Sequence, residues 1–117
     1  MGSGTTLVEA KLLGRNAVGI DINPKSVSIS ETNLQFQCDT SSKIYTRNGD
    51  AAELHFIKDA HIDFICTHPP YADIIKYSKG IEGDISMLGV KSFIDAMDKV
   101  AYEAYRVLKK GKMCAVM

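Results

Sequence analysis

The sequence has no tryptophan, only three prolines and three cysteines, and no net charge. The three cysteines, Cys38, Cys66 and Cys114, are odd in number and form no CxxC pair. This argues against a disulfide framework or a zinc site, so we expect no metal and a reducing, cytoplasmic setting. No apolar run approaches the ~20 residues that span a bilayer, and no signal peptide is visible at the N-terminus. We therefore expect no membrane partner.

Charge of either sign is also not concentrated anywhere along the chain. Residues 1–60 carry six cations and seven anions, and residues 61–117 carry eight and seven. This excludes a chain that binds nucleic acid mainly through bulk charge, although a small local patch remains compatible with it. The 117 residues suit one domain over 1–117.

Helical and strand patterns alternate along the chain, which predicts an α/β fold. Apolar periodicity and turn residues predict helices over 5–13, 24–36 and 90–109, strands over 17–21, 43–46, 61–66 and 113–117, and a long loop over 72–89. Gly14 is expected to end the first helix in a left-handed conformation, and Asn23 with Pro24 to start the second. Lys109, Lys110 and Gly111 are expected to end the last helix.

The same periodicity predicts which side chains are buried. On the second helix these are Val27, Ile29, Leu34 and Phe36. On the last helix they are Val90, Phe93, Ile94, Met97, Val100, Ala101, Ala104 and Leu108, with Tyr102 and Tyr105 assigned to packing.

The first motif with chemical content is Gly2-Ser3-Gly4-Thr5-Thr6, which runs directly into a helix. Glycines let the backbone turn without a side chain in the way of a ligand, and a helix start offers unpaired N–H groups. That arrangement suits a carboxylate or a phosphate. Met-Gly-Ser-Gly is also what the remnant of a purification tag looks like, so the glycines by themselves leave both interpretations open.

Two acidic residues follow predicted strands. Asp21 lies 17 residues after Gly4, at the end of its strand, where an acid accepts hydrogen bonds from ribose hydroxyls in dinucleotide-binding folds. Asp50 follows the next strand and could accept from an adenine amino group. Taken alone, Asp21 is better explained as a helix-capping residue before Asn23 and Pro24, and Asp50 as a turn aspartate beside Asn48 and Gly49.

A fourth signal, Thr67-His68-Pro69-Pro70-Tyr71, follows the strand over 61–66. Two successive prolines fix the backbone and leave carbonyl oxygens without competing N–H groups. With an aromatic ring next to them, they could hold a flat substrate that carries an amino group. The plain alternative is a strand ended by proline, followed by a packed tyrosine.

Taken together in this order, these motifs resemble the S-adenosylmethionine-dependent amino-methyltransferases of DNA, which methylate the exocyclic nitrogen of cytosine or adenine. The segment GSGTTLVEAKLLGRNAVGIDINP resembles that family's cofactor loop, first helix and second strand. THPPYADIIKYSKGIEGD resembles its catalytic loop, and YRVLKKGKMCAVM the helix and strand that follow. The resemblance implies a Rossmann-like methyltransferase core, and it makes the tag interpretation of the first residues less attractive.

The resemblance also implies roles for particular residues. For the cofactor, S-adenosylmethionine, Gly2, Gly4, Thr5 and Thr6 would surround the methionine part, Asp21 and Ile22 would hold the ribose and adenine, and Asp50 and Ala51 would meet the adenine amino group. In the catalytic loop of His68, Pro69, Pro70 and Tyr71, the Pro69 carbonyl would accept from the target amino group and Tyr71 would stack on a flipped-out base. The partner would be DNA.

The chain departs from the family pattern in two ways. His68 stands where the family has Ser, Asp or Asn, either as a tolerated variant or as a mark of decay, and it removes the clue that separates cytosine from adenine. The family's central strand, which precedes the glycine loop, and its strands after residue 117 are absent, so we expect an incomplete core. Unpaired backbone groups in a buried sheet are costly, so we predict that rearrangement or another copy of the chain, as a homo-oligomer, fills the gap.

Three functions remain open at this point. The leading one is the DNA amino-methyltransferase. A second keeps the cofactor and acts on an RNA base or a protein glutamine, although Ile74, Lys76, Tyr77 and Ser78 resemble the DNA group more closely. The third is a folded remnant without catalysis. Lys76, Tyr77 and Lys79 could contact phosphates or could belong to a solvated loop.

Overall fold

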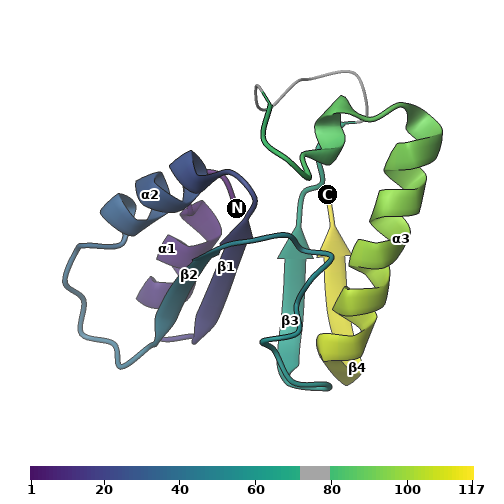
Figure 1. Cartoon of the computed structure of the whole chain (residues 1–117). Coiled ribbons are helices and arrows are strands. Elements are labelled where there is room, and N and C mark those ends of the chain that lie inside the picture. The colour runs from purple at the N-terminus through teal and green to yellow at the C-terminus, as the bar shows by residue number, and fades with distance from the viewer. Residues whose placement is uncertain (72–79) are drawn as a thin grey trace. The chain divides into compact units, whose positions relative to one another are not determined.

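A computed structural model describes residues 1–71 and 80–117. The chain divides into two compact units, Met1–Gly49 and Asp50–Met117. Helices and strands alternate through both units, as Figure 1 shows. The predicted α/β class is confirmed.

The first unit begins with α1 (Thr5–Leu12) and β1 (Ala17–Asp21), close to the predicted positions. Gly14 follows α1 with φ of +67°, the left-handed conformation expected of a glycine that ends a helix. The Lys11 side chain donates hydrogen bonds to the carbonyl oxygens of Leu34 and Phe36 at 2.7 and 2.6 Å. It therefore fastens α1 to the chain that follows the second helix.

The second helix, α2 (Pro24–Asn33), starts where the sequence predicts. The Asn23 side chain accepts the N–H of Lys25 at 3.0 Å, and proline occupies the first helical position. The helix ends three residues before the predicted Phe36. The predicted burial was right for Val27 and wrong for Ile29, which is 42 % exposed. The loose apolar pattern overestimated both the length of α2 and the width of its buried face.

Strand β2 (Ile44–Asn48) pairs in parallel with β1, and Asp21 is in register with Asn48. The strand runs two residues beyond the predicted end at Thr46, because the Asn48 side chain is anchored to β1. Its Nδ2 donates to the carbonyl oxygens of Asp21 and Ile22, each at 3.0 Å. Gly19 in β1 leaves space for the side chains of Met1 and Leu7, which a Cβ at this position would overlap.

The second unit contains β3 (Ile62–Thr67), a short 3₁₀ turn (Ile85–Met87), α3 (Val90–Val107) and β4 (Leu108–Val116). Part of the predicted long loop is thus ordered as a turn, where the Asp84 side chain accepts the N–H of Ser86 at 2.9 Å. Residues 72–79 of that loop lie outside the described residues. They include the residues that bear on the choice of substrate: Ile74, Lys76, Tyr77, Ser78 and Lys79.

The end of α3 differs from the prediction. The helix stops at Val107, and Lys109, Lys110 and Gly111 belong to β4 instead of ending the helix. In the parallel pair of β3 and β4, Ile62 is opposite Leu108 but Phe64 is opposite Met113, so the four residues 109–112 lie opposite Asp63 alone. Asp63 sits opposite this bulge and forms ion pairs with Lys109 and Lys112 at 3.1 and 3.4 Å. These partners lower the pKa of the Asp63 carboxyl.

Arg106 holds the loop before β3 against α3. Its guanidinium donates to the carbonyl oxygens of Leu54 and Ile57, each at 2.9 Å, and to the carboxylates of Glu103 and Asp59. Glu103 also accepts the N–H of Leu54 at 2.7 Å. Because a guanidinium presents five donors in a fixed fork, a single side chain can join several points of the loop to the helix. Leu54, Ile57 and Val107 form the buried apolar cluster beside it.

Several side chains expected in the core are exposed. On α3 these include Val90 and Ile94, 65 % and 54 % exposed, and the two tyrosines assigned to packing, Tyr102 and Tyr105, 70 % and 84 % exposed. Apolar side chains do follow one face of α3. Within the described residues, however, too little chain packs against the first turns of the helix to cover that face. Phe64 and Met113, partners across β3 and β4, are likewise 54 % and 71 % exposed.

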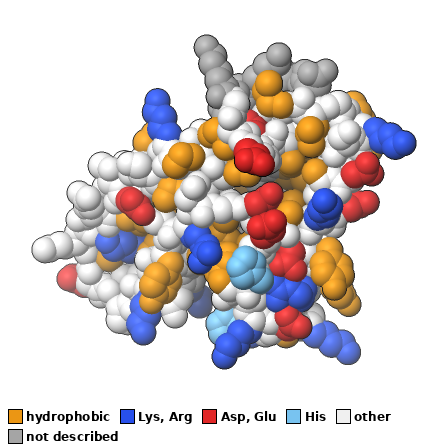
Figure 2. All heavy atoms as spheres, viewed as in Figure 1, with side chains coloured by type: hydrophobic (Ala, Val, Ile, Leu, Met, Phe, Trp, Pro, Cys, Tyr) orange, Lys and Arg blue, Asp and Glu red, His pale blue; other side chains and the backbone are white. Residues whose placement is uncertain are grey.

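The four strands form two separate two-stranded sheets among residues 1–71 and 80–117. Each of these strands thus has one neighbour in that part of the chain. In the same part, we find no helix that is long and apolar enough to cross a membrane. On the face drawn in Figure 2, basic side chains are scattered among acidic and apolar ones and do not gather in one patch.

Candidate functional site

The first predicted cluster, the glycine turn and Asp21, is brought together inside the first unit. The N–H of Gly2 and the ammonium of Met1 contact Asp21 Oδ2 at 3.1 and 2.9 Å. The other carboxylate oxygen accepts the N–H of Asn23 at 2.9 Å. The Asp21 side chain is only 16 % exposed. It is therefore a fixed, largely buried acceptor beside the turn and at the carboxyl end of β1.

The alternative interpretation of Asp21 as a helix-capping residue holds only in part. Asn23 itself caps α2, while Asp21 supports the turn that leads to it. Sequence proximity explains the bond to Asn23. It does not explain the bond to Gly2, which is nineteen positions away.

The geometry of the turn depends on two glycines and one buried serine. Gly2 and Gly4 have φ of +58° and +82°, a region that other residues rarely adopt. Ser30 of α2 is fully buried and donates its hydroxyl to the carbonyl of Gly2 at 3.1 Å. A Cβ on Gly4 would lie 2.7 Å from the Ser30 Oγ. Ser30 was not among the predicted site residues, since a serine on a loosely patterned helix gives no signal of such a contact.

Thr5 and Thr6 follow this turn as the first residues of α1. The helix start has no side-chain cap, and the nearest side-chain contact is between the hydroxyls of Ser3 and Thr5 at 3.3 Å. Four N–H groups at a helix start lack partners within the helix, and they carry partial positive charge. The two threonines therefore present backbone donors next to Gly4, as the motif predicted.

Asp50 and Ala51 follow β2. Asp50 Oδ1 accepts the N–H of Ala52 at 2.8 Å, which is the turn geometry that the plain interpretation of this residue expected. Ile22 is half-buried, and its carbonyl is bound by Asn48. Asn48 is a second residue that the sequence analysis overlooked, although its place in the turn signal Asn48-Gly49-Asp50 could have pointed to it.

In the catalytic-loop motif, His68 and Tyr71 contact each other. His68 Nε2 lies 3.2 Å from the Tyr71 hydroxyl, and the two rings meet edge to face with centroids 5.7 Å apart. Pro69 and Pro70 between them are half-buried. At the start of the motif, the Thr67 carbonyl accepts the N–H of Met117 at 3.0 Å, so the strand end is anchored.

Asp21 belongs to the first unit, and Asp50 with residues 68–71 belongs to the second. That Asp21, Asp50 and Tyr71 contribute to one site, as the family resemblance implies, stays a prediction, because these residues belong to two different units.

Comparison with known proteins identifies the family. A family model described as "RMKL-like, methyltransferase domain" matches residues 1–84, which is 84 of the 117 residues. The chain belongs to this family.

Two relatives agree with that assignment. The type II methyltransferase M.MjaII of Methanocaldococcus jannaschii is 54 % identical over 35 residues, which cover 30 % of this chain and 7 % of that protein. The crystal structure of a SAM-dependent methyltransferase from Methanosarcina mazei matches 98 % of this chain with a TM-score of 0.66 and 20 % identity. The chain spans 47 % of that structure, so it covers less than half of the length of either relative.

The likeness in structure supports the expected Rossmann-like fold of this methyltransferase domain. The family match confirms that the chain belongs to a methyltransferase family, while methyl transfer by this chain is a proposal. Neither relative shows that this chain acts on DNA, so the DNA substrate is a proposal.

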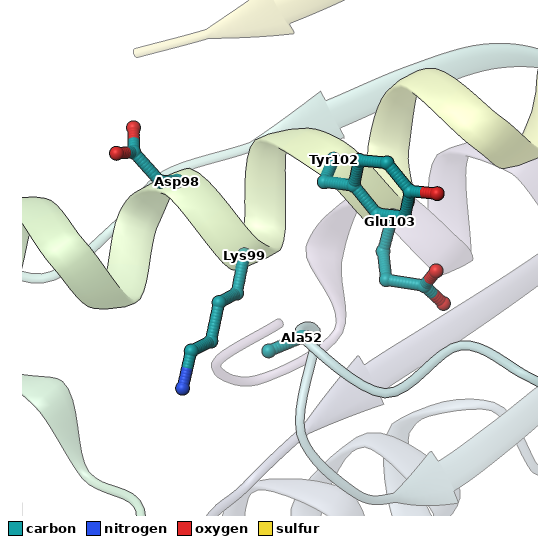
Figure 3. Close-up of a pocket in the computed structure, with 5 residues that line it drawn as sticks. All are labelled: Ala52, Asp98, Lys99, Tyr102 and Glu103. Carbon is teal, nitrogen blue, oxygen red and sulfur yellow. The ribbon is translucent and has the colours of Figure 1, made fainter.

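The methyltransferase domain also has a shallow hollow of about 460 Å³ on α3, lined by Ala52, Asp98, Lys99, Tyr102 and Glu103. Figure 3 shows Asp98 and Lys99 leaving opposite sides of the helix, with Lys99 extending toward the side where Ala52 lies on a loop. None of the predicted site residues lines it. Its most perturbed group is Glu103, whose pKa is lowered to about 2 by the hydrogen bond from Arg106. Because that carboxylate is bound by Arg106 and Leu54, it serves the fold and is not a free acid or base.

Proposed function

We propose that this domain uses S-adenosylmethionine to methylate an exocyclic amino group of a DNA base. The observation that carries the proposal is the bond between Gly2 and Asp21, which joins the glycine turn to the acid at the end of β1. Membership of a methyltransferase family and the similarity to a type II methyltransferase support it.

The residues of the turn fit such a cofactor. Asp21 is an ionised acceptor whose partners are all N–H donors, and ribose hydroxyls are donors to the same oxygens. A Cβ added at Gly2 would meet no atom within 4 Å, so the space beside this turn is open. The backbone of Gly4, Thr5 and Thr6 would hold the methionine part at the start of α1.

The remaining contacts would come from residues near the strand ends. Ile22 would pack on the adenine, and Asp50 with Ala51 would meet its amino group. When bound, the cofactor supplies an activated methyl group on a sulfonium. The work left to the chain is to align the target nitrogen with that methyl group and to stabilise the positive charge that develops on the nitrogen.

The residues of the His68–Tyr71 loop would receive the base. The Pro69 carbonyl would accept a hydrogen bond from the target amino group, and Pro70 would keep this carbonyl fixed in direction. Tyr71 is 47 % exposed, which leaves ring surface for stacking on a base extruded from the helix. Methyl transfer would form a carbon–nitrogen bond as the carbon–sulfur bond of the sulfonium is broken, and the amino group would release a proton to solvent.

The proposal is tested in two steps with the full chain. Calorimetry with S-adenosylmethionine should show binding, and transfer of a labelled methyl group should appear with double-stranded or single-stranded DNA. Ribosomal or transfer RNA and a glutamine-containing peptide are run in parallel. Labelling of DNA alone supports the proposal, while labelling of only RNA or peptide overturns the DNA assignment. An absence of both heat and transfer would leave a folded remnant that does not catalyse.

An RNA base is the second candidate substrate. The family match extends over residues 1–84, whereas the similarity to the type II methyltransferase extends over 35 residues. The description of the broader match names no substrate, so RNA is assayed beside DNA. The cofactor residues would be the same in either case, so only the nucleic-acid arms of the experiment separate the two.

A further inference from the structure

We propose that His68 is a positioning residue that holds the ring of Tyr71, and that it does not itself accept a hydrogen bond from the substrate's amino group. This inference rests on the proposed function, because it assigns the means by which the same loop receives a flat base. It starts from the contact between the His68 Nε2 and the Tyr71 hydroxyl at 3.2 Å.

The backbone between the two rings has little freedom. Thr67 is the last residue of β3 and is paired with Val116, so the chain enters the motif from a fixed point. Pro69 and Pro70 each fix φ near −65°, and each restricts the residue before it. His68 and Tyr71 are therefore held three positions apart by a stiff segment. Their edge-to-face contact, with centroids 5.7 Å apart, lies within the range that aromatic pairs prefer.

The hydrogen bond survives a change of imidazole tautomer. Nε2 either donates its proton to the phenol oxygen or accepts the phenol proton, and the contact is made in both cases. The second ring nitrogen, Nδ1, is an acceptor in the first tautomer and a donor in the second. An acceptor role toward an amino group is available in only one of these tautomers, whereas the role toward Tyr71 is available in both.

A base would therefore be held mainly by stacking on the Tyr71 ring, and less by a hydrogen bond from the Tyr71 hydroxyl. The Tyr71 hydroxyl is engaged by His68, while about half of the side chain is exposed. A ring held at one edge keeps its face in place, which lowers the entropy lost when a base stacks on it. The Pro69 carbonyl would remain as the acceptor for the amino group.

Two substitutions separate this role from a direct one. In His68→Gln the amide lies near the position of Nε2, so it keeps a partner for Tyr71. In His68→Asn the shorter amide lies near the position of Nδ1, so it offers an acceptor to a substrate but does not reach the tyrosine hydroxyl. A third variant, Tyr71→Phe, removes the hydroxyl and keeps the ring. His61→Asn, on an exposed residue outside the motif, is the matched control.

The first readout needs no substrate. In nuclear magnetic resonance spectra of the full chain, Overhauser contacts between the Tyr71 ring and the side chain of residue 68 should be present in the unmodified protein, in His68→Gln and in His61→Asn, and should be lost in His68→Asn. Contacts between the Tyr71 ring and residue 68 that persist in His68→Asn, or that are absent from the unmodified protein, would overturn the inference, whether or not the domain transfers methyl groups. The failure of this inference and the failure of the proposed function are thus seen separately.

The second readout is steady-state kinetics. The loss of one hydrogen bond that orders the ring should raise KM for nucleic acid roughly 5-fold in His68→Asn, with a smaller change in kcat. His68→Gln should restore KM to within about 2-fold. The double variant His68→Asn/Tyr71→Phe should be no worse than Tyr71→Phe alone, because both changes break the same contact. Full activity in His68→Asn together with loss in His68→Gln would instead assign His68 as the acceptor for the amino group.

Discussion

The carboxylate of Asp21 accepts a hydrogen bond from the backbone N–H of Gly2 at 3.1 Å, across nineteen positions of sequence. This bond ties the end of β1 to the turn that opens α1. It also sets the acid beside the open side of the turn, where a Cβ on Gly2 would meet nothing. The bond thus connects the two sequence motifs on which the proposed cofactor site depends.

We expect Asp21→Asn to weaken the binding of S-adenosylmethionine by roughly 10-fold or more, because an amide is a poorer acceptor than an ionised carboxylate for ribose hydroxyls. Isothermal calorimetry measures the effect. Asp39→Asn, on the exposed loop after α2, removes the same charge away from the turn and should leave the affinity unchanged. Equal affinity in both variants would remove Asp21 from the cofactor site.

Gly4→Ala should destabilise the first unit by about 2–5 kcal/mol. The left-handed conformation costs a residue with a Cβ about 1–2 kcal/mol, and the overlap with Ser30 adds about 1–3 kcal/mol. Gly2→Ala is the matched control, because its φ is also positive but its Cβ would meet no atom within 4 Å. Urea unfolding should give a clearly lower free energy of unfolding for Gly4→Ala than for Gly2→Ala. Equal losses would mean that the contact with Ser30 contributes nothing.

The second unit should lose stability in acid, because the stabilising contribution of the Glu103 carboxylate is lost when it binds a proton. Because Arg106 lowers the pKa of Glu103 from 4.5 to about 2, the unfolded chain binds a proton at this residue before the folded chain does. The stabilisation is therefore present above pH 4.5 and is lost as the pH falls toward about 2. Thermal unfolding across this interval should show a shallower pH dependence in Glu103→Gln than in the unmodified chain.

The control for this pH dependence is Glu53→Gln, which removes a carboxylate from an exposed position of the same unit. It should leave the pH dependence unchanged. A Glu103→Gln variant with the original pH dependence would show that another group is responsible for it.

We keep the prediction that copies of the chain associate. Each strand of the described residues has one neighbour, and strand edges with unpaired backbone groups are sites for pairing with another chain. Phe64 and Met113 add an exposed apolar pair on one face of β3 and β4. Light scattering after size exclusion should give a mass that rises with concentration, and Phe64→Glu should lower it.

Tyr105→Glu tests whether any exposed aromatic residue would have the same effect, because Tyr105 is 84 % exposed on α3 and not on a strand. It should leave the association unchanged. A monomer at all concentrations for the unmodified chain would contradict the prediction.

The elements that depend on neighbouring residues were predictable. Gly14 at the end of α1, and Asn23 with Pro24 at the start of α2, act through their own backbone angles and through hydrogen bonds within a few residues. The apolar strand β1 and its terminal Asp21 were likewise placed correctly. These signals are local, so a sequence contains them without reference to distant partners.

The end of α3 was wrongly predicted for the opposite reason. Lys109 and Lys110 are good residues for the end of a helix, but Asp63 of β3 binds Lys109 and Lys112 and favours the strand. Exposure of Ile29 and Ile94 was missed for a related reason, since helical periodicity marks a face but does not say whether anything covers it.

By itself, the sequence determined the order of helices and strands, the glycine turn, the acid at the end of β1 and the diproline motif. The tertiary structure decided that Gly2 binds Asp21, that Ser30 packs against Gly4 and that His68 meets Tyr71. The physical reason is distance along the chain for the first two contacts and side-chain orientation for the third. Backbone propensities and caps act over one or two turns of chain, whereas these contacts depend on how a side chain is oriented and on what folding brings next to it.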